Sequence, residues 1–164
     1  MSSSSAISAI AVFDEKKIKG VVRFTEDITN GCVVIDIDIL GGLGKNKLHG
    51  FHVHEYGDMS EKCTSMCSHF NPYGKKHGGP NSVERHVGDL GNIRSDANGC
   101  AKYRFTDKVI KLRGSKCNIM GRGVIIHADE DDLGIGGEPD SLTTGHAGAR
   151  IACAVIGYAK DKPC

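Results

Sequence analysis

The stretch Ile35-Asp36-Ile37-Asp38-Ile39 alternates apolar and acidic side chains over five consecutive positions. Because successive side chains of a β-strand point to opposite faces, the three isoleucines share one face and the two aspartates the other. This pattern predicts a half-buried strand. Similar windows, separated by clusters of Gly, Asn and Asp, predict strands at about 6–13, 17–24, 32–40, 48–55, 100–106, 123–127 and 151–159, with a weaker one at about 86–93.

About eight short strands without intervening amphipathic helices are typical of an all-β sandwich or barrel. The composition agrees, because 22 of the 164 residues are glycine and none is tryptophan. A chain of this length corresponds to a single domain spanning 1–164 that can bury its own core. The serine run at 2–5 predicts a frayed terminus over residues 1–5.

Two stretches do not have the strand pattern: 56–85 and 128–150, both rich in glycine. Each is longer than about 15 residues, and loops of that length in a compact domain are usually functional or disordered. Ordering such a loop costs conformational entropy that a bound metal or a disulfide can offset. We therefore expect two long functional loops.

The charges exclude one class of partner. The chain has 21 basic and 20 acidic residues, for a formal net charge of +1, and it has no basic stripe of the kind that a nucleic acid requires.

The N-terminal residues lack a secretory pattern, and no run of about 18 apolar residues occurs. We expect a cytoplasmic protein without nucleic-acid or membrane partners. The seven cysteines leave at least one thiol free or shared between chains.

Histidines are concentrated in a few segments. In Gly50-Phe51-His52-Val53-His54-Glu55, two imidazoles two residues apart in a strand point to the same face, whereas Phe51 and Val53 point into the core. Taken alone, this pattern is equally compatible with two incidental surface histidines. A His-x-His strand also occurs in cupins, but there the metal-binding glutamate follows after a spacer, and Glu55 adjoins His54.

The later histidines favour a metal site. His69, His77 and His86 lie in or directly after the first long loop, Asp89 follows three residues after His86, and His127 ends a predicted strand. Imidazole suits copper and zinc, and three histidines with one carboxylate form a closed tetrahedral zinc set.

These residues belong to segments that resemble the copper,zinc superoxide dismutase family. The matching segments are Leu48-His49-Gly50-Phe51-His52-Val53-His54-Glu55, His69-Phe70-Asn71-Pro72, Lys76-His77-Gly78-Gly79-Pro80, Glu84-Arg85-His86-Val87-Gly88-Asp89-Leu90-Gly91-Asn92, Asp131-Asp132-Leu133-Gly134 and Gly148-Ala149-Arg150-Ile151-Ala152-Cys153. The resemblance implies an eight-stranded antiparallel Greek-key sandwich or barrel. It also implies an antioxidant oxidoreductase that disproportionates superoxide to O₂ and H₂O₂.

The resemblance implies one copper and one zinc per chain. It assigns copper to His52, His54, His69 and His127 and zinc to His69, His77, His86 and Asp89, so that His69 bridges the two metals. A bridging imidazolate loses both ring protons and couples the redox state of the site to a proton. Zinc does no redox chemistry and orders the loop.

Further roles follow from the same resemblance. Asp131 corresponds to the carboxylate that hydrogen-bonds one histidine of each metal set. Arg150 corresponds to the arginine that attracts and orients the small anion.

The resemblance also assigns the cysteines. Cys63 and Cys153 correspond to the intramolecular disulfide. Cys67 has no counterpart in the usual pattern, and it is either an alternative disulfide partner or a free thiol. We expect Cys32, Cys100, Cys117 and Cys164 to be packing or surface thiols.

The chain departs from the family at a few positions. Asp129 and Thr143 stand where the family often has lysines near the channel mouth, and His146 replaces an asparagine, so the resemblance does not extend to electrostatic steering by these positions. Family dimer contacts are recognisable near Tyr56-Gly57, Met120-Gly121-Arg122 and Ala154-Val155-Ile156-Gly157-Tyr158, and we expect a homodimer. The segment Ala149-Arg150-Ile151 lacks the prolines that accompany a strict need for a copper chaperone, so such a partner is not expected to be obligatory.

Two other functions compete with this interpretation. One is a copper chaperone-like or inactive homologue, which typically lacks a copper ligand or the arginine. The other is a sandwich with a structural zinc site alone, which leaves His52, His54 and His127 unexplained.

Overall fold

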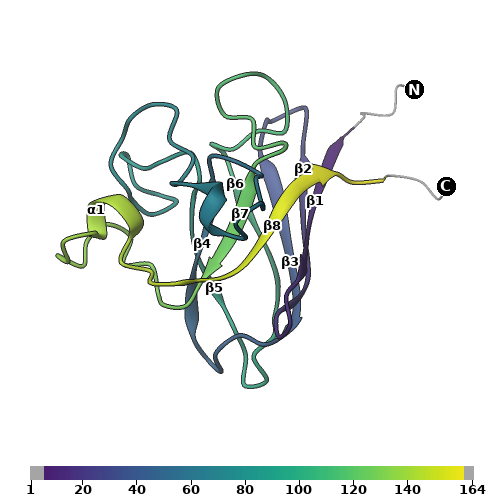
Figure 1. Cartoon of the computed structure of the whole chain (residues 1–164). Helices are drawn as coiled ribbons and strands as arrows, with labels where there is room; N and C mark the ends of the chain where they lie inside the picture. The colour runs from purple at the N-terminus through teal and green to yellow at the C-terminus, as the bar shows by residue number, and fades with distance from the viewer. Residues whose placement is uncertain (1–5, 161–164) are drawn as a thin grey trace.

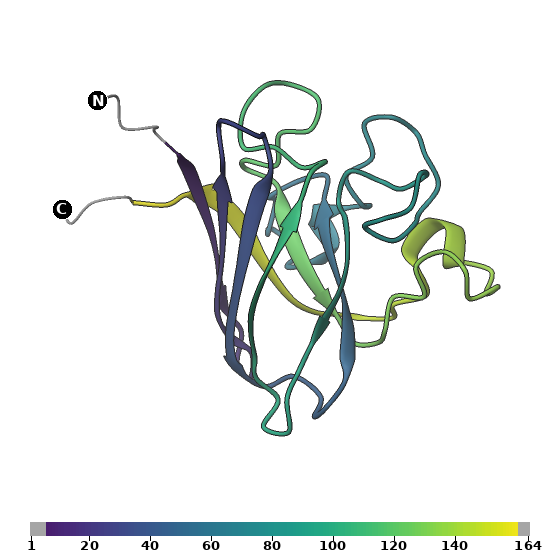
Figure 2. The same ribbon diagram turned by 180° about the vertical axis from the view of Figure 1, so that it is seen from behind.

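A computed structural model describes residues 6–160 of the chain, and the predicted frayed terminus at 1–5 and Cys164 lie outside that range. The described residues form an eight-stranded antiparallel barrel, seen from two sides in Figures 1 and 2. The strands are β1 (Ile7–Asp14), β2 (Lys19–Glu26), β3 (Val33–Gly41), β4 (Leu48–His54), β5 (Asp89–Arg94), β6 (Ala101–Asp107), β7 (Gly123–His127) and β8 (Arg150–Tyr158). Two short helical turns, η1 (Thr64–Met66) and α1 (Ser141–Thr144), lie in the loops.

The strand order around the sheet is β5-β4-β7-β8-β1-β2-β3-β6. Strands β1, β2 and β3 form successive hairpins, whereas the chain crosses the barrel between β3 and β4 and again between β6 and β7. These crossings give the Greek-key arrangement that the resemblance implied. Strands β5 and β6 contact each other without a shared ladder, so the barrel is nearly closed.

All eight predicted strands are present, with boundaries that differ by one to three residues at most of their ends. The isoleucines of β3 are buried and its aspartates half-buried, as their alternation predicts. Together with Phe13, Phe24 and the apolar residues of the other strands, they form the barrel core. The core therefore follows directly from the period-two pattern.

The two predicted long loops are the connections 55–88 and 128–149, and a third long connection spans 108–122. The third was not predicted. It packs Ile110, Leu112 and Ile119 against the barrel core, and Glu26 fixes it by accepting a hydrogen bond from the Leu112 backbone. Its apolar residues therefore serve as a cap on the barrel rather than as strand residues.

Strand β4 departs from simple alternation, because six of its seven residues are buried. Phe51 and Val53 point into the barrel core, as predicted, while His52 and His54 point outward and lie beneath the two loops. The predicted metal ligands on this strand thus lie in a second, polar interior between the barrel wall and the loops. Within residues 6–160, no helix has the length and apolar character needed to cross a lipid bilayer.

Candidate metal centre

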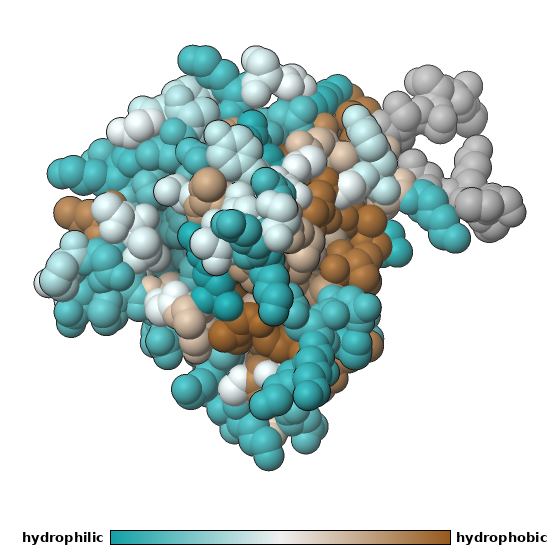
Figure 3. Space-filling view, in the orientation of Figure 1, coloured by the Kyte–Doolittle hydropathy of each residue, from teal (hydrophilic) through white to brown (hydrophobic). Residues whose placement is uncertain are grey.

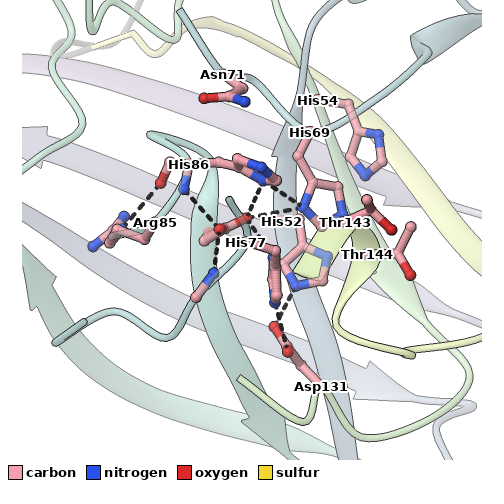
Figure 4. Close-up of polar contacts among 12 residues, drawn as sticks. His52, His54, His69, Asn71, His77, Arg85, His86, Asp131, Thr143 and Thr144 are labelled. Atoms are coloured by element: carbon pink, nitrogen blue, oxygen red, sulfur yellow. Dashed lines mark hydrogen bonds and ion pairs between the residues drawn. The ribbon is translucent and has the colours of Figure 1, made fainter. Parts of the chain in front are cut away.

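The barrel and its loops bring together all seven predicted ligands, and each of them is buried. Strand β4 supplies His52 and His54, the 55–88 loop supplies His69, His77 and His86, and Asp89 begins β5. His127 ends β7, where a β-bulge shifts the register and places it opposite Arg150. Figure 4 shows most of this cluster on the wall formed by β4 and its neighbours. The side chains form two overlapping sets, His52, His54, His69 and His127, and His69, His77, His86 and Asp89.

Three histidines belong to the first set alone, and one ring nitrogen of each donates a hydrogen bond to a fixed acceptor. His54 Nδ1 donates to the Cys67 carbonyl at 2.8 Å, His127 Nδ1 donates to the Gly148 carbonyl at 3.1 Å, and His52 Nε2 donates to a carboxylate oxygen at 2.7 Å. The acceptors hold the proton on that nitrogen, so the other nitrogen presents a lone pair.

Those remaining nitrogens converge. His52 Nδ1, His54 Nε2, His69 Nε2 and His127 Nε2 are buried, have no hydrogen-bond partner, and lie within 4.8 Å of one another. A buried polar atom without a partner is costly, and four lone pairs that face one space are what a cation would satisfy. The set therefore fits a metal with imidazole preference, such as copper.

The second set is centred on Asp89. One of its carboxylate oxygens, Oδ1, lies 2.8 Å from His69 Nδ1, 3.0 Å from His77 Nδ1 and 3.1 Å from His86 Nδ1. The other oxygen accepts hydrogen bonds from the backbone N–H groups of Gly78 and His86, which fix the orientation of the carboxylate. Three imidazoles and one carboxylate oxygen at this spacing fit tetrahedral zinc.

His69 belongs to both sets. Its Nδ1 faces Asp89, and its Nε2 faces the first set without a hydrogen-bond partner. The rings of His52 and His69 are only 4.1 Å apart between centroids. One imidazole therefore presents a nitrogen to each of two candidate metal sites, which is the geometry of a bridge.

Asp131 forms a second link between the two sets, in addition to His69. Its Oδ2 accepts a hydrogen bond from His52 Nε2 at 2.7 Å, and its Oδ1 accepts one from His77 Nε2 at 2.8 Å. Asn92 holds the Asp131 backbone at both its N–H and its carbonyl. Burial opposes ionisation, but the bonds from His52 and His77 outweigh it and lower the pKa of Asp131 to about 2. Asp131 is thus a charged acceptor for both histidines.

Burial also sets the protonation of the histidines. It lowers the pKa of His52 to about 3 and that of His127 to about 4, and it holds the pKa of His54 well below the usual range. These rings are therefore neutral near pH 7, as metal ligation requires. For His77, burial acts in the same direction, but bonds to Asp131 and Asp89 outweigh it and raise the pKa to about 9. Metal binding in the second set thus displaces a proton.

Arg150 lies at the start of β8 and is tied to the first long loop. Its guanidinium donates to the Cys63 carbonyl at 2.7 Å and to the Cys67 carbonyl at 2.6 Å. Cys63 is disulfide-bonded to Cys153 with the Cα atoms 5.6 Å apart, as the resemblance implied. Cys32, Cys67, Cys100 and Cys117 are free thiols among residues 6–160. The disulfide and Arg150 together hold the loop against β8.

Two of the three departures from the family, Thr143 and Asp129, line different cavities. Thr143 lines a cavity of about 400 Å³ that reaches His69 and His86 and also contains Lys75 and Lys76. Asp129 lines a separate cavity of about 350 Å³, with Lys47 and Arg94. His146 is exposed and forms an ion pair with Asp140 at 2.6 Å.

Three supporting residues had no predicted role. His49 Nδ1 donates to the His127 carbonyl at 2.8 Å, and Asn92 anchors Asp131. Gly145 has φ of +70°, and a Cβ there would come within 2.1 Å of Asp131 Oδ1 and 2.5 Å of His77 Nε2. The local sequence signals none of these contacts, because each depends on a partner at least 14 residues away.

The fold and this geometry define a β-barrel metalloprotein with two candidate metal-binding sets that share one histidine. Its sequence matches the profile of the family described as "Copper/zinc superoxide dismutase (SODC)" over residues 18–156. The chain belongs to this copper/zinc superoxide dismutase family. Copper and zinc are accordingly its metals and superoxide its substrate, and the chaperone-like alternative is not favoured.

The similarity extends over almost the whole chain. A Cu-Zn superoxide dismutase of Paramecium bursaria Chlorella virus 1 is 60% identical over 158 residues, which cover 96% of this chain and 82% of the viral protein. One of Yarrowia lipolytica is 51% identical over 92% of this chain and 97% of the yeast enzyme. The solved structure of the "clock protein EA4" has a TM-score of 0.89 at 44% identity, with 97% of this chain and 99% of that chain covered.

Proposed function

We propose that copper is held by His52, His54, His69 and His127 and zinc by His69, His77, His86 and Asp89 in this superoxide dismutase. The observation that carries the assignment is the position of His69, whose two ring nitrogens face the two ligand sets. Copper supplies the electron acceptor and donor for two successive superoxide molecules, and zinc supplies a redox-inert charge that orders the loop.

The protein contributes a proton site and an anion site. The Nε2 atom of His69 has no hydrogen-bond partner, so its lone pair is free to take up a proton when it does not ligate a cation. That proton is placed for transfer to the peroxide formed from superoxide. Arg150, oriented by the Cys63 and Cys67 carbonyls, attracts the anion and positions it.

The experiment that tests this proposal combines metal analysis with a superoxide-consumption assay on one preparation. We expect one copper and one zinc per chain, with activity proportional to copper content. Stoichiometric zinc with no copper bound and no dismutation would contradict the assignment of the first set.

We also propose a homodimer. Val12, Tyr56, Val155 and Tyr158 are large exposed hydrophobic residues, and hydrophobic surface gathers near β1 and β8 in Figure 3. Such a contiguous patch favours association with a second copy. Analytical ultracentrifugation should give about twice the 17.5 kDa chain mass, and Tyr158→Glu should shift the protein to monomers.

Two further proposals concern the protein in the cell, and both rest on the sequence alone. We propose a cytoplasmic location and copper loading that does not strictly require a chaperone. Loading by a copper salt alone, with recovery of full activity from metal-free protein, supports the second proposal. Localisation of a fluorescently tagged chain tests the first.

A further inference from the structure

A cavity of about 660 Å³, larger than the two already described, lies where strands β5 and β6 meet without a shared ladder. Leu48 of β4 and Arg94 of β5 line one side of it, and Lys102 and Tyr103 of β6 line the other. Cavities of about 300–1,000 Å³ are the size that small-molecule ligands occupy in proteins. None of its lining residues is one of the seven predicted metal ligands, so the cavity is separate from the metal centre.

Most hydrogen-bond acceptors that line this cavity are engaged within the protein. Asp96 Oδ1 accepts hydrogen bonds from two backbone N–H groups of its own turn, at 2.8 and 3.0 Å. The Asn92 amide binds both the N–H and the carbonyl of Asp131, and the Ser95 hydroxyl accepts a hydrogen bond from the Lys47 N–H. The cavity therefore has few acceptors to offer a ligand.

The donors of the same cavity are free. Within residues 6–160, the exposed side chains of Arg94 and Lys102 form no ion pair and no hydrogen bond. Asp38 stands opposite Lys102 in the β3–β6 ladder, but the described residues contain no ion pair between them. The Tyr103 oxygen accepts a hydrogen bond from the Arg94 backbone N–H at 3.0 Å, so its own O–H proton remains available. Two cations and a hydroxyl donor thus flank the seam between β5 and β6.

The cavity also has carbon surface, which Leu48 and the ring of Tyr103 provide. We propose that it binds a phosphate monoester with an aromatic or apolar body, whose phosphate is held by Arg94, Lys102 and the Tyr103 hydroxyl. A guanidinium presents paired N–H donors to phosphate oxygens, and an ammonium adds a compact charge. A dianionic phosphate suits two cations better than a monoanionic carboxylate does, because the attraction grows with the charge. The body of the ligand lies against Leu48 and the Tyr103 ring.

The neighbouring cavity of about 350 Å³ shares Arg94 with this one but is less suited to an anion. Two carboxylates, those of Asp129 and Glu130, line it. Asp96 is the one carboxylate among the residues that line the larger cavity, and backbone N–H groups already bind it. Since carboxylates repel a phosphate, the phosphate is favoured on the β6 side of Arg94.

Isothermal titration of the metal-loaded protein with phenyl phosphate, at about 0.15 M salt, tests the site. We expect one molecule per chain with a Kd on the order of 1 mM or below. Inorganic phosphate lacks the body and benzyl alcohol lacks the charge, so each should bind at least about tenfold more weakly. The measurement needs no activity, so its failure would leave the proposed dismutase function intact.

Arg94→Gln and Lys102→Gln should each weaken the binding of phenyl phosphate by about fivefold or more, because each removes a charged donor. The matched control is Arg104→Gln, which makes the same charge change on β6. Arg104 is ion-paired with Asp36 and does not line the cavity. This variant should bind within about twofold of the wild type, since salt screens the more distant charge.

Arg150 is the other arginine that could hold the anion, and Arg150→Ala should bind phenyl phosphate as the wild type does. Loss of binding in Arg150→Ala, with Arg94→Gln and Lys102→Gln unaffected, would place the anion at the metal centre and overturn the proposal. No binding to the wild type up to about 10 mM would overturn it as well. Benzoate that binds as tightly as phenyl phosphate would overturn the choice of a phosphate over a carboxylate.

Discussion

Asp131 Oδ2 lies 2.7 Å from His52 Nε2, and both side chains are completely shielded from solvent. The other oxygen of the same carboxylate binds His77. A single aspartate thus fixes one histidine of each candidate metal set and leaves the Nδ1 atom of both rings facing a metal position. The two sets are therefore coupled by a carboxylate as well as by His69.

Asp131→Asn should weaken the binding of both metals, by roughly 10- to 100-fold each, because the amide no longer supplies a charged acceptor for either ring. Titration of metal-free protein with copper and zinc in the presence of a competing chelator measures both affinities. Glu130→Gln, which changes an exposed neighbour, is the matched control. A loss confined to one metal would show that Asp131 serves only one set.

His127→Ala should remove copper and dismutase activity while zinc and the fold are kept. The reason is that His127 belongs only to the first set and stands at the end of a rigid strand. Metal content, activity and circular dichroism of one preparation measure the three effects. His146→Ala, at an exposed histidine outside both sets, should leave both metals bound. Near-normal dismutation with one copper per chain would reject His127 as a ligand.

Asp89→Ala should release zinc and loosen the 55–88 loop with copper still bound. Asp89 is the only carboxylate of the second set, and without it three neutral imidazoles face a dication. A chelator competition reports zinc affinity, and hydrogen exchange reports the loop. The control is Asp58→Ala, at an exposed aspartate of the same loop. Unchanged zinc affinity would remove Asp89 from the site.

Cys63→Ser should lower thermal stability sharply, because the disulfide closes a sequence separation of 90 residues. The chain-entropy relation gives about 4–5 kcal/mol for such a loop, which corresponds to a fall in melting temperature of roughly 10 °C or more. Cys117→Ser should change the melting temperature much less, because Cys117 is a free thiol. Equal melting temperatures for the two variants in calorimetry would show that the disulfide contributes little.

Arg150→Ala should slow superoxide consumption and remove most of its dependence on ionic strength. Exposed charges are screened over about 10 Å at 0.1 M salt, so steering appears as a rate that falls as salt is added. Asp129→Lys should raise the rate at low salt, because this exposed carboxylate lies close to Gly148, whose carbonyl binds His127.

Stopped-flow rates over a salt series, with the visible copper spectrum as a control, test both variants. A steep salt dependence that survives Arg150→Ala would contradict this account of steering. It would point instead to Lys75 and Lys76, which line the cavity that reaches His69.

Local sequence determined the eight strands and the types of ligand available. The alternation in β3 and the His-x-His pair of β4 are properties of neighbouring residues, and the period of two fixes which side chains share a face. The two long loops were also predictable, because glycine and proline interrupt that period. The connection 108–122 was not, because its alternation at Ile110-Lys111-Leu112-Arg113 covers only four residues, and its apolar residues are buried by contact with the barrel core.

Only the tertiary structure decided which atoms meet. The choice of Nδ1 or Nε2 as the free nitrogen depends on acceptors such as Asp131, 79 residues from His52, and Gly148, 21 residues from His127. Likewise, Glu15 lies beside Cys153 although 138 residues separate them. Strand periodicity says which face a side chain occupies, but the packing of loops against the barrel decides its partners, and that packing is made of contacts between distant parts of the chain.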